Sequence, residues 1–120
     1  MSGGRASRAK GNRVEREIVH RLQDAGFAAE RVPLSGSAGG PFSGDVTVPL
    51  LGVDRRVEVK ARGNGFARLY AWLSRADVLV LRADRAEPLV VVPLRLAIEI
   101  AQAAERARAL EQGEAPTKKT

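Results

Sequence analysis

Two stretches decide the fold of this chain: DVTVPLL at residues 45–51 and RVEVKA at residues 56–61. Both are rich in valine or leucine, and a short turn at residues 52–54 separates them, so we predict an antiparallel strand pair. Because side chains alternate across a strand, Glu58 and Lys60 would project together to one face while the valines between and beside them face the core.

Three side chains of this strand pair suggest its chemistry. Antiparallel pairing would bring Asp45 close to the face that carries Glu58 and Lys60. Two hard carboxylates beside one lysine are what a Mg²⁺-dependent phosphodiesterase needs, because the carboxylates hold the ion while the ion and the lysine handle the attacking water and the phosphate charge. The alternative is structural, since a Glu-Val-Lys triplet is common on exposed strands. The basic composition and the glycine-rich loop before Asp45 favour the catalytic interpretation.

The composition limits the class of protein. A chain of 120 residues forms one domain with a single modest core. Its 20 lysines and arginines against 14 acidic residues give a net charge of +6, which favours a polyanionic partner such as nucleic acid. The absence of cysteine and the single histidine, His20, exclude disulfides, thiolate zinc sites and a multi-histidine metal centre. With no apolar run near ~20 residues and no signal-peptide core, we expect a cytoplasmic, nucleoid-associated protein with no membrane partner and no small-molecule cofactor.

The remaining pattern predicts an α/β fold with a central mixed β-sheet flanked by helices. Residues 1–10 are expected to be a flexible basic arm, residues 35–44 a mobile loop and residues 114–120 a disordered polar tail. Hydrophobic spacing predicts helices at 12–25, 66–76 and 94–112, and further strands at 27–34, 77–81 and 88–92, the last two buried. Gly26 is expected to cap the first helix.

One acidic residue of the first helix is a further candidate for the site. Glu15 aligns with the apolar Val19 and Leu22, so its carboxylate would lie at the edge of the buried stripe. The alternative is a capping box, since Asn12 and Glu15 have the required Asn-x-x-Glu spacing.

Basic residues on the first helix and near the strand pair are candidates for contacts to DNA phosphates, and the alternative is a solvated charged surface. Tyr70 and Trp72 are expected in the core or at a subunit interface. The candidate DNA-binding residues are Lys10, Arg13, Arg16, Arg31, Arg62 and Arg68.

Taken together, the motifs resemble the archaeal-type Holliday junction resolvases, a branch of the PD-(D/E)XK nuclease superfamily. The similar segments run in the same order over about residues 10–62, and Gly44 stands where the name of the motif has proline. They are KGNRVERE at residues 10–17, GFA at 26–28 followed by Arg31, PLSGS at 33–37, Asp45, and the triplet Glu58-Val59-Lys60.

The resemblance implies a restriction-endonuclease-like (PD-(D/E)XK) core, with the nuclease domain at residues 11–113. It implies that Glu15, Asp45 and Glu58 ligate or position Mg²⁺, for which Mn²⁺ would substitute, with the Val59 carbonyl as an added ligand. Lys60 would orient or activate the water. On the same grounds Ser35 would assist at the phosphate, and Arg16 and Arg31 would contact DNA.

Members of that family act as homodimers, so the resemblance implies a dimer that nicks branched DNA symmetrically, as a twofold substrate requires. Two alternatives stay open: a nuclease of the same chemistry with another DNA substrate in repair, restriction or phage biology, and a non-catalytic basic DNA-binding module. The alanine- and arginine-rich composition hints at a bacterial or phage source.

Overall fold

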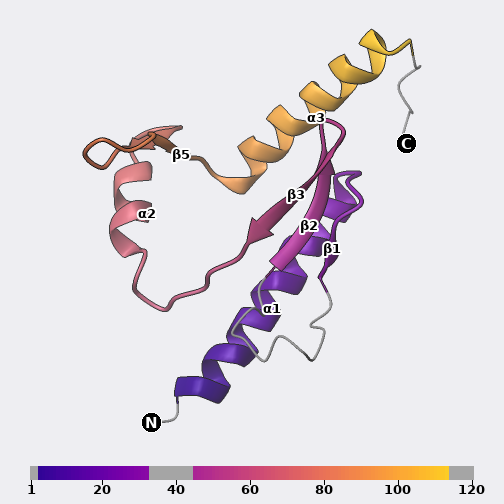
Figure 1. Ribbon diagram of the computed structural model, residues 1–120. Helices are drawn as coiled ribbons and strands as arrows, with labels where there is room; N and C mark the ends of the chain where they lie inside the picture. Colours follow the sequence, from indigo (N-terminus) through magenta and orange to yellow (C-terminus); the bar gives the residue numbers. More distant parts are fainter. Residues whose placement is uncertain (1–2, 33–44, 114–120) are drawn as a thin grey trace. The chain divides into compact units, whose positions relative to one another are not determined.

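The computed structural model describes residues 3–32 and 45–113 (Figure 1). The chain divides into two compact units, which are described separately. The first comprises Met1–Ala61 with Ala104–Thr120, and the second comprises Arg62–Ala103. No helix in the described ranges is long and apolar enough to cross a membrane.

The first unit is built on a long helix, α1 (Gly3–Asp24). Its expected start near Asn12 was wrong, because the helix begins at Gly3; the flexible basic arm expected at residues 1–10 stays a prediction. The expected cap at Gly26 is confirmed: Gly26 has φ +101°, its N–H donates to the Gln23 carbonyl, and the Phe27 N–H donates to the Leu22 carbonyl. This pair of bonds is the Schellman motif, which turns the chain sharply away from the helix axis.

The same unit holds a three-stranded antiparallel sheet in the order β1-β2-β3. Its strands are β1 (Glu30–Arg31), β2 (Asp45–Leu50) and β3 (Val53–Glu58). The predicted strand pair is therefore confirmed, but its turn is not at residues 52–54. Leu50 pairs with Val53, so Leu51 and Gly52 form a two-residue turn, and both have positive φ, as a type I′ hairpin requires.

One face of this sheet packs against α1 (Figure 1). Val46 is fully buried there, and Val19, Ala29 and Val48 complete the buried cluster. Leu22, Phe27, Val57 and Val59 pack around it. Because residues 57 and 59 point into this core, the residues between and beside them on β3 lie on the opposite face.

The second unit contains α2 (Ala67–Leu73), β4 (Leu79–Leu81), β5 (Leu89–Val91) and the first part of α3 (Leu94–Glu111). The two strands pair antiparallel as a separate sheet. The expectation that both strands are buried was wrong, because Val80, Leu89 and Val90 are exposed. Within β4 the outer residues are half-buried and the central one is exposed, so only one face of the strand is covered.

The α/β class is confirmed by these elements. The described strands form two antiparallel sheets, where the sequence predicted one mixed sheet. An apolar run of three to five residues indicates a strand, but it does not specify which neighbour the strand pairs with.

Candidate functional site

The hairpin register brings together two of the predicted site positions. Asp45, the first residue of β2, is the Cα partner of Glu58, the last residue of β3. Directly opposite positions in an antiparallel pair lie on one face, with Cβ atoms about 4.5–5.5 Å apart. The described part of the chain includes the backbone of Asp45 and not its side chain, so the register is the observation that relates the two positions.

Lys60 lies next to Glu58 on the same face. Its Nζ is 2.9 Å from Glu58 Oε2, and both side chains are more than half exposed. The predicted alternation is therefore confirmed: Val57 and Val59 pack against the core, and Glu58 and Lys60 meet on the solvent side. The Val59 carbonyl remains a predicted ligand.

The surroundings of Glu58 keep its carboxylate ionised. The hydrogen bond and the positive charge of Lys60 lower the pKa of Glu58; desolvation opposes this, and the charge of Arg56 makes the smallest contribution, also lowering it. Arg56 is two residues before Glu58 on β3 and so occupies the same face. The sequence analysis missed Arg56, although the alternation of residues 56, 58 and 60 could have identified it.

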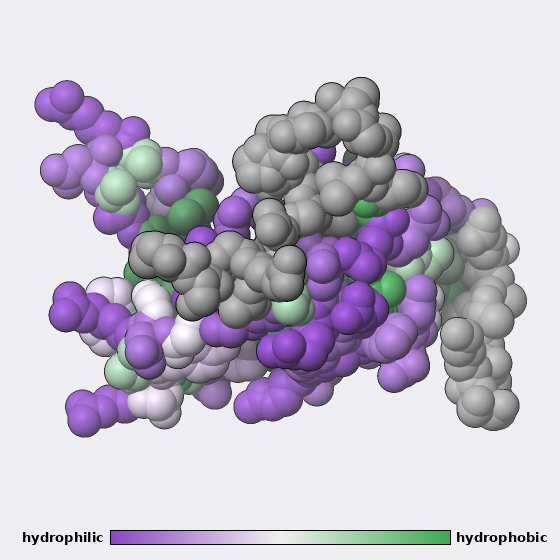
Figure 2. All heavy atoms as spheres, turned by 90° about the horizontal axis from the view of Figure 1, so that it is seen from below, coloured by the Kyte–Doolittle hydropathy of each residue, from purple (hydrophilic) through white to green (hydrophobic). Residues whose placement is uncertain are grey.

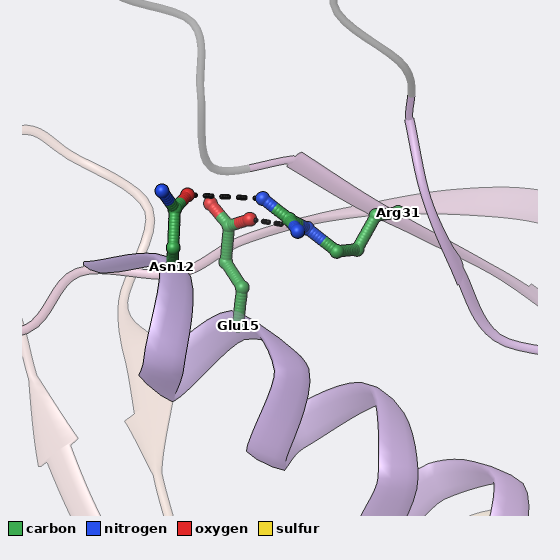
Figure 3. Close-up of polar contacts among 3 residues, drawn as sticks. All are labelled: Asn12, Glu15 and Arg31. Carbon is green, nitrogen blue, oxygen red and sulfur yellow. Dashed lines mark hydrogen bonds and ion pairs between the residues drawn. The ribbon is translucent and has the colours of Figure 1, made fainter. Parts of the chain in front are cut away.

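A second polar cluster joins α1 to β1 (Figure 3). The Glu15 carboxylate is buried, with 2% of the residue exposed, and Arg31 Nε donates to its Oε1 over 2.9 Å. Arg31 Nη2 donates to the side-chain oxygen of Asn12, also over 2.9 Å. The guanidinium thus neutralises a carboxylate that would otherwise be buried without a counter-charge.

This cluster bears on the two interpretations of Glu15, whose role in the site stays a prediction. The expectation that Glu15 borders the buried stripe is confirmed by its burial. The capping-box alternative is wrong, because α1 begins at Gly3 and Asn12 lies well inside the helix. The side chain of Asn12 instead accepts a hydrogen bond from Arg31, 19 residues further along the chain.

The two clusters occupy opposite faces of the sheet. Arg31 is the Cα partner of Val46, which points into the core beneath α1, whereas Glu58 lies on the side opposite to Val57. Among the side chains that the structure describes, no three from His, Cys, Asp or Glu form a group that could hold a metal ion. Ser35 lies outside the described residues.

The predicted DNA-contacting residues all lie in the described part of the chain. Arg13 and Arg16 are exposed on α1, Arg31 is exposed on β1, and Lys10 is half-buried. Arg62 and Arg68 are exposed in the second unit. Figure 2 shows that hydrophilic residues cover most of the described surface on the face it presents.

Two aromatic residues of α2 were expected in the core or at a subunit interface. Tyr70 is 74% exposed and Trp72 is 51% exposed, so the core placement was wrong. The partly covered side of α2 carries Leu69 and Leu73, which are half-buried, and no residue of this helix is fully buried. The interface placement stays a prediction.

These observations define an α/β protein in which the β2–β3 hairpin and the residues just after it carry two acidic residues and a lysine: Asp45, Glu58 and Lys60. Residues 6–105 match the family described as archaeal Holliday junction resolvase (Hjc). This match covers most of the chain, and the chain belongs to that family. The resemblance drawn from the motifs is thereby confirmed.

Relatives with curated names agree with the family. The chain is 43% identical over 60 residues to a crossover junction endodeoxyribonuclease Hjc of Sulfurisphaera tokodaii, and 42% identical over 60 residues to one of Sulfolobus acidocaldarius. Each alignment covers 50% of this chain and 42% of the relative, so less than half of each relative is matched. These relatives are archaeal and give no support to the suggested bacterial or phage source. No solved structure matches the chain.

Proposed function

We propose that this chain is a Mg²⁺-dependent, structure-specific endodeoxyribonuclease that nicks four-way DNA junctions. The observation that carries the proposal is the hairpin register that sets Asp45 opposite Glu58, with Lys60 paired to that glutamate, in a chain of the resolvase family. The names of the relatives, crossover junction endodeoxyribonucleases, agree with it.

The residues of the hairpin fit a hard divalent cation. Glu58 supplies an exposed carboxylate whose lowered pKa keeps it charged, and Asp45 is a second carboxylate at the position directly across the ladder. Oxygen ligands of this kind are what Mg²⁺ prefers, with water completing its shell. When bound, Mg²⁺ would supply a Lewis acid for the phosphate and a more acidic water. Glu15 as a further ligand stays a prediction, and its carboxylate is paired with Arg31 in the structure.

Lys60 has two tasks in this proposal. Its ammonium holds the Glu58 carboxylate in place through the 2.9 Å contact. It also carries three N–H donors, so donors remain to orient the attacking water or to contact a phosphate oxygen. Positive charge fixed at this point stabilises the developing negative charge of the transition state. Ser35 as a helper at the phosphate remains a prediction.

DNA binding is assigned to the exposed arginines of α1 and β1, because sequence-independent phosphate contacts supply most of the affinity of such proteins. We further propose a homodimer, since a twofold dimer presents two sites to the two opposing strands of a junction. The finer fold, a PD-(D/E)XK core, belongs to the same proposal and is supported by the family match.

The proposal is tested by cleavage of branched DNA with purified protein in Mg²⁺, compared with Asp45→Asn and Glu58→Gln. Both variants keep the side-chain size and remove the ionised carboxylate. We expect each to lose at least a hundredfold in cleavage rate while binding the junction as tightly as the parent in Ca²⁺. Cleavage by both variants at the parental rate would refute the assigned site. Binding without cleavage by the parent would favour the DNA-binding module.

A further inference from the structure

The Arg31 guanidinium is held by two side chains of α1. Glu15 and Asn12 lie three residues apart on α1, so both side chains come from the same face of the helix. Glu15 accepts from Nε and Asn12 accepts from Nη2 of the same guanidinium (Figure 3). Two acceptors on one rigid helix fix both the position and the plane of the group.

This arrangement leaves one edge of the guanidinium available. Arginine has five N–H donors, and the contacts to Asn12 and Glu15 use two of them. Because Nε and Nη2 share one edge of the planar group, the other edge has a donor on each of Nη1 and Nη2, and these donors have no partner among the residues that the structure describes. The Arg31 side chain is 38% exposed, so part of it is in contact with solvent.

Such an edge matches one chemical class of ligand. Two parallel N–H donors in a fixed plane bind two oxygens of a phosphate at once, which a freely rotating arginine does less well. The Glu15 carboxylate alone would leave the group free to pivot about the Nε contact. The bond to Asn12 removes that freedom, so less entropy is lost when a phosphate binds.

We propose that Asn12 is a positioning residue that presents Arg31 for bidentate binding of a DNA backbone phosphate. The proposal rests on the proposed function, because it presumes that the ligand is DNA. Asn12 acts here through Arg31 alone and does not itself contact the nucleic acid.

The test is a double-mutant cycle on junction binding, measured by fluorescence anisotropy with a labelled four-way junction and no divalent metal. The variants are Asn12→Ala, Arg31→Ala and the double substitution. His20→Ala is the control, since it is an exposed residue of the same helix with no assigned role. We expect Asn12→Ala to raise Kd by roughly three- to tenfold, the equivalent of immobilising one long side chain on binding, and His20→Ala to leave it unchanged.

The melting temperature and the salt dependence of binding distinguish a positioning role of Asn12 from an effect on folding and from an effect on charge. Alanine favours helix more than asparagine, so Asn12→Ala should melt no lower than the parent even though it binds more weakly. Asn12→Ala should keep the parental salt dependence of binding, whereas Arg31→Ala should reduce its slope by about one ion. In the Arg31→Ala background, adding Asn12→Ala should change Kd by less than twofold.

Parental affinity in Asn12→Ala, or an equal loss in both backgrounds, would overturn the inference and leave the proposed function standing. A parent protein that binds no junction would overturn both.

Discussion

At the residue scale, the ion pair between Glu58 and Lys60 favours the ionised form of the Glu58 carboxylate. Lys60 lies 2.9 Å from Glu58, and Arg56 adds a second positive charge on the same face. The hydrogen bond from Lys60, its positive charge and, least of all, the charge of Arg56 favour the ionised carboxylate, so the pKa of Glu58 is lowered. The Glu58 carboxylate therefore stays ionised down to a lower pH than an isolated glutamate, as the proposed metal-binding role requires.

We predict that Glu58 in the metal-free protein titrates below the ordinary glutamate value of 4.5, with Lys60 as the main cause. Lys60→Met should raise the pKa of Glu58, and Arg56→Gln should raise it less. NMR detection of the Glu58 side-chain carboxyl carbon measures both. A pKa lowering that survives in Lys60→Met would contradict the assignment.

The lowered pKa of Glu58 determines how the ion pair changes protein stability with pH. Because the folded pKa is the lower one, the pair contributes its stability above pH 4.5, and the contribution disappears as the pH falls through the folded pKa. In Lys60→Met, the free energy of unfolding should therefore fall less as the pH is lowered, because the contribution of the Glu58–Lys60 pair is absent. Since Glu58 is exposed, the effect is small beside the whole acid transition.

Residue-level patterns predicted part of the site. Alternation placed Glu58 and Lys60 together, and helical spacing placed Glu15 at the buried edge, because both periods are local. The partners of Glu15 were not predicted. Arg31 and Asn12 are 19 residues apart in the sequence, and their contact forms only because β1 packs on α1. The spacing of residues within one segment does not predict such a contact.

At the element scale, the hairpin turn sets the register and therefore the site. Leu51 has φ +56° and Gly52 has φ +80°. Leucine is costly in this region, and an Asn-Gly pair would be the usual choice. The Leu51 N–H donates to the carboxylate of Glu105 on α3, and Glu105 also pairs with Arg108. A long-range acceptor thus supports a turn that its own sequence disfavours, which explains why sequence reasoning misplaced it.

We predict that Leu51→Asn stabilises the protein by about 0.5–1 kcal/mol, because asparagine adopts positive φ more readily and Leu51 is 44% exposed. Gly52→Ala should destabilise it by about 1–2 kcal/mol for the opposite reason. A Cβ at Gly52 would also lie 2.7 Å from Arg108 Nη2, although that flexible side chain can move. Urea unfolding measures both changes, and equal midpoints for the two variants would contradict this account of the turn.

The acceptor itself provides a separate test of the turn. Glu105→Ala should lower the free energy of unfolding by about 0.5–1.5 kcal/mol, the usual value of one hydrogen bond. In the Leu51→Asn background the loss should be the same or smaller, since asparagine needs less support. Glu99→Ala, at an exposed position of the same helix, is the matched control.

At the scale of the whole molecule, the basic balance predicts how binding responds to salt. Each lysine or arginine that binds a phosphate releases counterions, so removing one such side chain changes the slope of log K against log salt by about 0.9. We predict that replacing both Arg13 and Arg16, exposed on α1, with glutamine flattens the slope by about two. Arg106→Gln on α3 is the control. An unchanged slope in the α1 variant would remove this helix from the DNA interface.

The sequence predicted the helices, the strands and the central hairpin of the molecule, with boundaries shifted by several residues. The pairing of the strands into two sheets was not predicted. Helix and strand propensities act over a few residues, whereas sheet order depends on contacts between segments far apart in the chain.

The most direct test of the central claim is cleavage of an end-labelled four-way junction beside a linear duplex of matching sequence, in Mg²⁺, with Asp45→Asn as the control. The account predicts paired, symmetric nicks in the junction alone, abolished by the substitution, which also requires a working dimer. Equal cutting of both DNAs would contradict junction specificity and leave a nuclease with another substrate. Cutting that persists in Asp45→Asn would contradict the site itself.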